Sequence, residues 1–203
     1  MSTGTIIFSN GASCSGKTTI ARAIQEVMPE PYLHVGLDHF EAMQPCKQGK
    51  RIHVFYGQGI EAKDLVPVMH QCIAGFASAG ANVVVEHILL NRAWLRDAVE
   101  RLSGYAVLFV GVSCPVVELG RRECEREGSN PSSGQAARQF RQLASLDVDQ
   151  PYDVAVDTST MSPVECVMRI KQHLDGEGNM AMGAFSRLKN SPILGEPDPV
   201  SAG

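Results

Sequence analysis

Short apolar runs rich in β-branched residues alternate with longer amphipathic stretches along this 203-residue chain. Such alternation is typical of a parallel sheet whose two faces are covered by helices. It predicts a three-layer α/β/α fold with a five-stranded parallel sheet. The expected strands are residues 5–9, 32–35, 82–86, 105–112 and 154–157, and the expected helices are residues 17–28, 63–79, 92–102, 116–127, 135–145 and 162–174.

Two of these helices carry clear local signals. Over residues 92–102, apolar side chains from Trp94 to Leu102 recur at three- and four-residue steps, which predicts one buried stripe with Trp94 in the core. The last helix is preceded by Ser-Pro-Val-Glu, in which Ser162 and Glu165 have the spacing of a capping box and the proline fits the first turn. We therefore expect this helix to begin at Ser162.

The length suits one domain with a short appendage. We expect a folded unit over residues 1–175, with a lid segment at about residues 121–134. Residues 176–203 contain glycines, prolines and serines without a clear period, which predicts a flexible C-terminal tail. Candidates in the tail for docking on the folded unit are Met180, Met182, Phe185 and Leu188.

Composition excludes several classes of protein. The six cysteines form no C-x-x-C pair, which favours free thiols in a reducing compartment over a disulfide framework or a zinc cluster. Neither a secretory signal nor an apolar run of about 20 residues is present, so we expect a cytoplasmic protein without a membrane partner. With 18 basic and 22 acidic residues, a net charge of −4 and no basic block, we expect no nucleic-acid partner.

A phosphate-binding motif follows the first expected strand. The segment from Gly11 to Thr18 reads G-A-S-C-S-G-K-T and matches G-x-x-x-x-G-K-[ST] at every fixed position. Glycines let backbone N–H groups surround an anion, Lys17 can reach the β- and γ-phosphates, and the Thr18 hydroxyl can bind Mg²⁺. The expected cofactors are therefore ATP and Mg²⁺. The expected nucleotide-binding residues are Gly11, Ala12, Ser13, Cys14, Ser15, Gly16, Lys17, Thr18 and Thr19.

Acidic side chains follow two other expected strands, at the sheet edge where ligands of open α/β sheets bind. Asp38, after residues 32–35, is a candidate general base for an attacking substrate hydroxyl. Holding Mg²⁺ through water or capping the following short helix are its alternative roles. Phe40 lies nearby and is a candidate substrate-binding residue. Glu86 is expected to face the cleft and contact substrate or the water shell of Mg²⁺, the alternative being a solvated strand end.

A basic helix end leads into a segment rich in glycine, serine and proline. Arg122 and Arg126 lie four residues apart and share a helix face, as expected for a lid that brings guanidinium groups to phosphates. We expect both to be catalytic. The alternative is a solvated charged helix with Glu123, Glu125 and Glu127 as partners. Residues 157–160, after the last strand, are expected to border the adenine.

Together these segments resemble the chloramphenicol phosphotransferase family over about residues 4–174. The resemblance rests on the phosphate-binding motif, Gly36-Leu-Asp-His-Phe40, Ala79-Gly-Ala-Asn-Val-Val-Val-Glu86, Arg122-Glu-x-x-Arg126, and Tyr152-Asp-Val-Ala-Val-Asp-Thr-Ser with Ser162-Pro-Val-Glu-Cys166. It implies a nucleoside-monophosphate-kinase-like fold and ATP-dependent phosphorylation of a small-molecule hydroxyl, with Asp38 as general base. In the name-giving member the acceptor is the primary hydroxyl of chloramphenicol, which makes chloramphenicol 3-O-phosphotransferase activity, and hence antibiotic resistance, a candidate function here.

The sequence departs from the family pattern at two places. Glu86-His87 stands where the family more often has aspartates, and Asn130 stands where an arginine is expected. The segment over residues 44–59, expected to cover the acceptor pocket, indicates no particular substrate. Two alternatives to the small-molecule kinase therefore remain open, namely a zeta-toxin-like nucleotide-sugar kinase and a regulatory ATPase that binds partners. The oligomeric state is not indicated.

Overall fold

The computed structural model describes residues 2–47, 50–51, 65–127, 135–147, 152–176 and 183–195. Its centre is a five-stranded sheet in the order β2-β5-β1-β6-β7, in which every neighbouring pair is parallel. The predicted fold class is therefore confirmed. The strands are β1 (Thr5–Asn10), β2 (Tyr32–Gly36), β5 (Asn82–His87), β6 (Ala106–Ser113) and β7 (Val154–Asp157), and a separate antiparallel pair is formed by β3 (Cys46–Lys47) and β4 (Lys50–Arg51).

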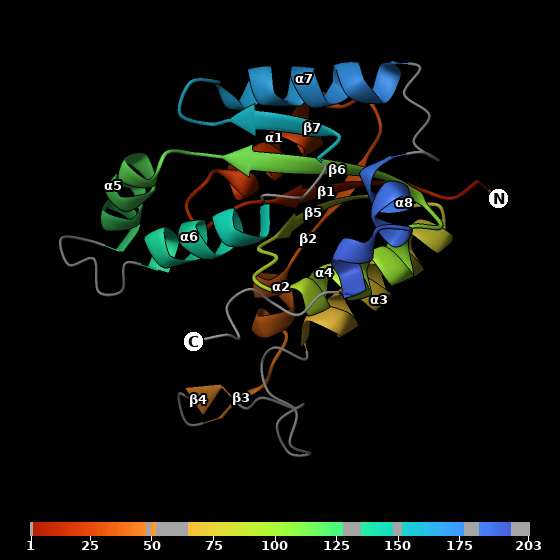
Figure 1. Cartoon of the computed structure of the whole chain (residues 1–203), viewed down its shortest axis with the longest axis horizontal. Coiled ribbons are helices and arrows are strands. Elements are labelled where there is room, and N and C mark those ends of the chain that lie inside the picture. Colours follow the sequence, from red (N-terminus) through yellow and green to blue (C-terminus); the bar gives the residue numbers. More distant parts are fainter. Residues whose placement is uncertain are drawn as a thin grey trace.

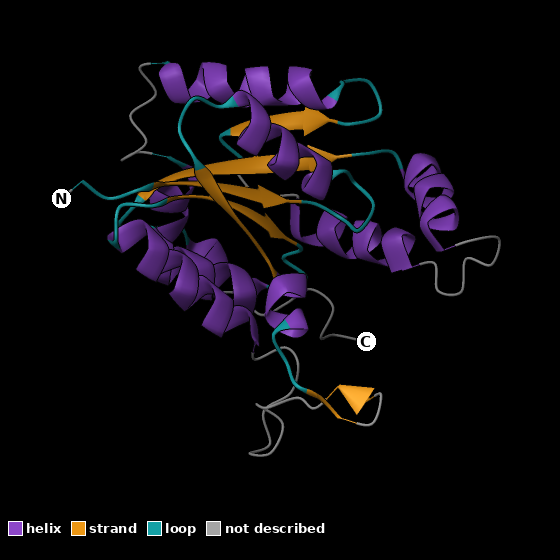
Figure 2. Ribbon diagram, turned by 180° about the vertical axis from the view of Figure 1, so that it is seen from behind, coloured by secondary structure: helices purple, strands orange, loops and turns teal. Residues whose placement is uncertain are grey.

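Helices cover both faces of the sheet (Figure 1). One face carries α1 (Lys17–Val27) and α7 (Pro163–Asp175), and the other carries α3 (Leu65–Ser78), α4 (Arg92–Leu102) and α8 (Ala184–Lys189). The ribbon seen from behind shows α5 and α6 beyond the strand arrowheads (Figure 2). The remaining helices are α2 (Leu37–Ala42), α5 (Val116–Glu127), α6 (Gln135–Asp147) and the 3₁₀ turn η4 (Pro192–Gly195).

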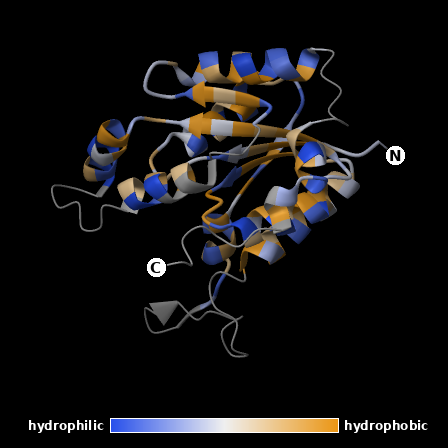
Figure 3. Ribbon diagram, viewed as in Figure 1, coloured by the Kyte–Doolittle hydropathy of each residue, from blue (hydrophilic) through white to orange (hydrophobic). Residues whose placement is uncertain are grey.

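Figure 3 colours much of the central strands as hydrophobic. Successive side chains of a strand point to opposite faces. On β1, Ile6 and Phe8 therefore join the core under α3 and α4, while Ile7 joins the core under α1 and α7. All three are completely buried. Burial on both faces explains why these strands read as continuous apolar runs.

The helix signals in the sequence are matched closely. Ser162 accepts from the Glu165 N–H and the Glu165 carboxylate accepts from the Ser162 N–H, so the predicted capping box starts α7. The Asn91 side chain caps α4 by accepting from the Trp94 N–H at 2.8 Å. Trp94 packs against the core, although part of its surface stays accessible.

The C-terminal segment differs from the expected flexible tail over residues 183–195. Phe185 is 1% exposed and packs with Phe8 and Phe109 at ring-centroid distances of 5.2 and 5.1 Å. The Asp153 carboxylate accepts from the Ala184 N–H, and Arg96 donates to the Leu194 carbonyl. Phe185 and Leu188 therefore dock as core residues. Met180 and Met182 lie outside the described residues.

The predicted free thiols are confirmed at the cysteines for which the structure gives a state, namely Cys14, Cys72, Cys114, Cys124 and Cys166. Within the described part of the chain, we find no helix with the length and apolar character needed to cross a membrane.

Candidate active site

The phosphate-binding motif forms the turn between β1 and α1. Gly16 has a φ of +93°, a left-handed conformation that glycine adopts without strain, and Cys14 shares it with a φ of +61°. At Gly11, an added Cβ would come within 2.4 Å of the Val112 carbonyl oxygen, so the loop packs too closely on β6 for a side chain there. These constraints explain the two glycines of the motif.

Lys17 lies folded over this loop. Its Nζ donates to the carbonyl oxygens of Gly11 at 2.9 Å and of Ala12 at 2.6 Å. Burial lowers the pKa of Lys17 to about 8, against the opposing effect of the Glu86 and Asp38 charges. The ammonium group is therefore held at the place where the motif would hold phosphate oxygens, with two neutral carbonyls as its present hydrogen-bond partners.

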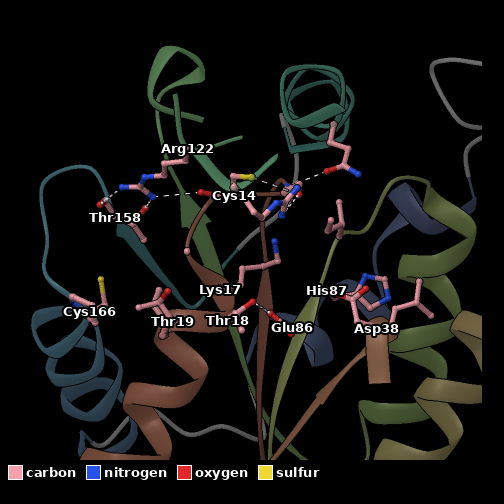
Figure 4. A pocket seen from close by; sticks show the side chains of 18 of the residues that line it. Cys14, Lys17, Thr18, Thr19, Asp38, Glu86, His87, Arg122, Thr158 and Cys166 are labelled. Atoms are coloured by element: carbon pink, nitrogen blue, oxygen red, sulfur yellow. Dashed lines mark hydrogen bonds between the residues drawn. The ribbon is translucent and has the colours of Figure 1, made fainter. Parts of the chain in front are cut away.

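Glu86 links the end of β5 to the start of α1. The Thr18 hydroxyl donates to Glu86 Oε2 at 2.6 Å (Figure 4). His34 Nε2 lies 3.1 Å from Glu86 Oε1. Burial favours the protonated acid, but His34, Thr18 and the Lys17 charge together hold the pKa of Glu86 below its usual value. Only 14% of the side chain is exposed, which rules out the alternative of a solvated strand end.

Asp38 lies in the first turn of α2, with its side chain exposed at the wall of the cavity described below. The N-cap of α2 is Gly36, whose N–H donates to His39 Nδ1 at 3.0 Å. His39 therefore provides the cap, and the capping alternative for Asp38 is wrong. Phe40 packs against the core and is absent from the cavity lining, so its expected substrate contact has no support in the structure.

The two candidate lid arginines differ in their surroundings. Arg122 donates to the Cys14 carbonyl, to both oxygens of Thr158 and to Glu118, so it joins α5 to the phosphate-binding loop and the loop after β7. Arg126 is exposed and also lines the cavity, with Nη1 3.4 Å from Ser13 Oγ. Residues 128–134, including Asn130, lie outside the described residues.

The alternative of a solvated charged face fits a neighbouring residue. Arg121 pairs with Glu118 and Glu125 on the exposed side of α5. Glu123 is 2% exposed and accepts from the Ala136 N–H at the start of α6. Glu123 is therefore not part of a solvated face, because its carboxylate is buried between α5 and α6.

Most of the predicted site residues line one cavity of about 890 Å³, whereas Gly11, Ala12, Ser15 and Phe40 do not. Those that line it are Ser13, Cys14, Gly16, Lys17, Thr18, Thr19, Asp38, Glu86, Arg122 and Arg126. In Figure 4, Thr158 and Cys166 lie at one end, Asp38 and His87 at the other, and Lys17 and Thr18 between them. A cavity of this size is large enough for a nucleotide together with a small molecule. Lining residues that sequence reasoning did not assign to the site include Met69, Ile88, Leu90, Trp94, Gln139, Met161, Pro163 and Cys166.

Most of these additional residues carry no sequence signal, because apolar side chains on helices read as core. Gln139 is an instructive case, since its Oε1 accepts from the Ser13 N–H of the phosphate-binding loop at 2.9 Å. The two residues lie 126 positions apart in the sequence, so nothing local indicates their contact.

Known proteins are similar in sequence to nearly the whole of this chain. Two proteins of Mycobacterium tuberculosis, from strains CDC 1551 and H37Rv, are each 30% identical over 212 residues, covering 93% of this chain and 89% of their own. Both carry the name "Putative O-phosphotransferase".

Solved structures support the fold assignment. A sugar kinase from Janibacter superposes with a TM-score of 0.61 at 20% identity, covering 89% of this chain and 99% of that one. The M. tuberculosis APS kinase, solved with AMPPNP and APS, gives 0.60 at 15% identity, covering 87% and 100%. The family model described as chloramphenicol phosphotransferase-like protein matches residues 4–175, so the chain belongs to the chloramphenicol phosphotransferase-like family.

Proposed function

We propose that the protein transfers the γ-phosphoryl group of ATP to a hydroxyl group of a small molecule, with Mg²⁺ as the metal ion. The observation that carries this proposal is that one cavity is lined by Lys17 and Thr18 of the phosphate-binding loop and by Asp38 of α2. A phosphate donor and a carboxylate able to accept a proton would therefore meet in one cavity.

The phosphate-binding loop would hold the β- and γ-phosphates. The Lys17 ammonium would exchange its contacts with the Gly11 and Ala12 carbonyls for phosphate oxygens, a better match for a positive charge. Arg126, beside Ser13, would reach the same oxygens from α5. Because both groups are cationic, they stabilise the negative charge of the phosphoryl group during transfer.

Magnesium fits the donor set at the Thr18–Glu86 contact. A hydroxyl and an ionised carboxylate are oxygen ligands of the kind that Mg²⁺ prefers, the carboxylate directly or through water. When bound, the ion neutralises charge on the β- and γ-phosphates. Glu86 is therefore assigned to the metal rather than to the acceptor, and Thr18 would give up its hydrogen bond to Glu86.

The adenine base of ATP would lie at the opposite end of the cavity from Asp38. Thr158, Met161, Pro163 and Cys166 line that end, and Arg122 is fixed beside it by its bonds to Thr158. These side chains offer apolar surface and a planar guanidinium group, both suited to the faces of a nucleobase.

The acceptor would enter beside α2. Asp38 would accept the proton of the attacking hydroxyl, while Leu90 and Trp94 provide apolar walls. Chloramphenicol is the first candidate acceptor because the family model takes its name from phosphorylation of that compound. Antibiotic resistance and a cytoplasmic setting, where ATP is available and the thiols stay reduced, follow as parts of this proposal.

Incubation with ATP, Mg²⁺ and a panel of hydroxylated antibiotics, sugars and nucleosides, read by mass spectrometry, tests the proposal. We expect one added phosphoryl group on a panel compound, lost in the Lys17→Met variant. The proposal would be contradicted if ATP were hydrolysed to inorganic phosphate at the same rate with and without the panel compounds while every compound stayed unmodified.

A further inference from the structure

Gln139 of α6 makes a polar contact with the phosphate-binding loop that the proposed transfer does not use. Its Oε1 accepts from the Ser13 N–H at 2.9 Å, and both residues line the cavity. Gln139 is 9% exposed, whereas Arg138 and Arg141 on the same helix are exposed. Glutamine is usually left in solvent, so its burial against the loop indicates a specific contact.

The direction of this hydrogen bond follows from the groups involved. A backbone N–H can only donate, and the carboxamide of glutamine offers one acceptor atom, Oε1, and one donor atom, Nε2. The oxygen of the Gln139 carboxamide must therefore face Ser13, and the loop N–H is satisfied by a neutral carbonyl oxygen.

Ser13 is the third residue of the motif that runs from Gly11 to Thr18. In loops of this kind, the backbone N–H groups donate to phosphate oxygens. One N–H makes one well-aligned hydrogen bond, so the Ser13 N–H serves either Gln139 or a phosphate oxygen. The phosphate oxygen is the stronger acceptor because it is ionised.

Lys17, the other donor of the loop described above, is satisfied in a similar manner. Its Nζ donates to the neutral carbonyl oxygens of Gly11 and Ala12. Those two partners belong to the loop itself. Gln139 lies 126 positions from Ser13, so a substitution removes its oxygen while the sequence of the loop stays intact.

The packing of α6 holds Gln139 against the loop. Ala136, Gln139 and Leu143 are spaced by three and four residues and share one face of the helix. Ala136 and Leu143 belong to a buried apolar cluster that includes Ala12 of the loop. The Ala136 N–H also donates to the buried Glu123 carboxylate of α5. The Gln139 carboxamide is therefore held in place by its own helix.

We propose that Gln139 Oε1 is a built-in competitor of nucleotide phosphate for the Ser13 N–H. Before nucleotide binds, this oxygen satisfies the N–H and ties α6 to the loop. When ATP binds, a phosphate oxygen takes the N–H and Gln139 is released. ATP affinity is thereby held below the value that the loop alone would give. This inference rests on the proposed function, since it describes how the same site is regulated.

The substitution Gln139→Met removes the oxygen and keeps the length of the side chain. The Ser13 N–H then lacks its partner before nucleotide binds, but not afterwards. We therefore expect ATP affinity, measured by calorimetry with Mg²⁺, to rise by about threefold to tenfold. Affinity for adenosine, which has no phosphate, should change by less than about twofold. Gln172→Met, at an exposed position of α7 outside the cavity lining, is the matched control and should change neither affinity.

Gln139→Glu supplies the opposite change at the same position. A carboxylate still accepts from the Ser13 N–H, and more strongly, while its negative charge repels phosphate. We expect ATP affinity to fall by at least about tenfold, with adenosine affinity kept. Simple damage to the site would lower ATP affinity in both variants, so the opposite signs of the two effects distinguish competition from damage.

The ¹H–¹⁵N signal of Ser13 in the full chain gives the second readout. Without nucleotide, we expect this signal to differ between the wild type and Gln139→Met. With saturating ATP and Mg²⁺, the two proteins should give the same Ser13 signal. An ATP affinity unchanged or lowered by Gln139→Met would overturn the inference, even if a panel compound is phosphorylated. Failure of every panel compound to be phosphorylated would count against the proposed function and leave these binding results as they are.

Discussion

The Thr18 hydroxyl and the Glu86 carboxylate are joined by a 2.6 Å hydrogen bond across the carboxyl edge of the sheet. Thr18 belongs to α1 and Glu86 to β5, the strand that pairs directly with β1. Strand pairing therefore brings together two oxygen groups that lie 68 residues apart in the sequence. The proposed metal site therefore lies at the start of α1, beside the phosphate-binding loop.

Replacing the carboxylate tests its assignment to the metal. We expect Glu86→Gln to raise the Mg²⁺ concentration needed for half-maximal turnover by about tenfold or more, because a neutral amide binds Mg²⁺ weakly. Glu86→Asp, which keeps the charge, should be affected less. Equal Mg²⁺ dependence of the wild type and Glu86→Gln, measured by turnover at fixed ATP, would remove Glu86 from the metal site.

Nucleotide binding should depend on pH through Lys17. Its pKa is lowered to about 8, so the amine loses its proton as the pH rises through 8 and the charge needed for phosphate oxygens disappears. We expect ATP affinity, measured calorimetrically, to fall by up to about tenfold per pH unit above 8. Lys17→Met should bind ATP weakly without this dependence.

The same pKa shift makes the free energy of unfolding rise with pH, whereas ATP affinity falls. Between about 8 and the ordinary value of 10.5, the unfolded chain binds more protons than the ligand-free folded protein. Lys17 therefore makes a contribution to the free energy of unfolding that rises with pH across this window. Lys17→Met should abolish that contribution.

Substitutions of the two candidate lid arginines should separate the effects on ATP binding from those on phosphoryl transfer. Arg122 donates hydrogen bonds to Cys14 and Thr158 at the end of the cavity proposed for the adenine. Arg122→Ala should therefore weaken ATP binding by about tenfold. Arg126→Ala should lower kcat with ATP affinity largely kept. Arg121→Ala, on the exposed side of α5, is the control, and comparable effects of all three substitutions would contradict this division.

The docking of α8 can be measured as stability. Phe185→Ala should lower the free energy of unfolding by about 3–5 kcal/mol, because it leaves a cavity beside Phe8 and Phe109. Phe185→Leu should cost less, since most of the volume remains. A denaturation midpoint unchanged in Phe185→Ala would mean that this segment is not part of the folded unit.

Local patterns in the sequence were enough to predict most of the fold. The capping box at Ser162 and the strand that ends before Gly11 depend on residues close together in the chain, and both signals agree with the structure. For Phe185, the sequence predicted a flexible tail and left docking as an alternative. Its burial to 1% exposure results from packing against residues of β1 and β6, which lie far away in the sequence.

For the candidate site, the sequence indicated where a residue lies in the fold better than which side chains it contacts. Asp38 and Glu86 were correctly expected at the carboxyl edge of the sheet, where the topology places them. The contact of Gln139 with Ser13 had no detectable signal, since it joins α6 to a loop far away in the sequence. Contacts of this kind depend on tertiary packing, which spacing along one element does not reveal.

The fate of an isotopically labelled γ-phosphoryl group tests the central claim most directly. With γ-¹⁸O-labelled ATP, Mg²⁺ and the panel acceptor, we predict that the label appears on the acceptor with the wild type. Asp38→Asn should bind ATP normally and transfer the phosphoryl group at least about a hundredfold more slowly. Label found only in inorganic phosphate, or undiminished transfer by Asp38→Asn, would contradict the account.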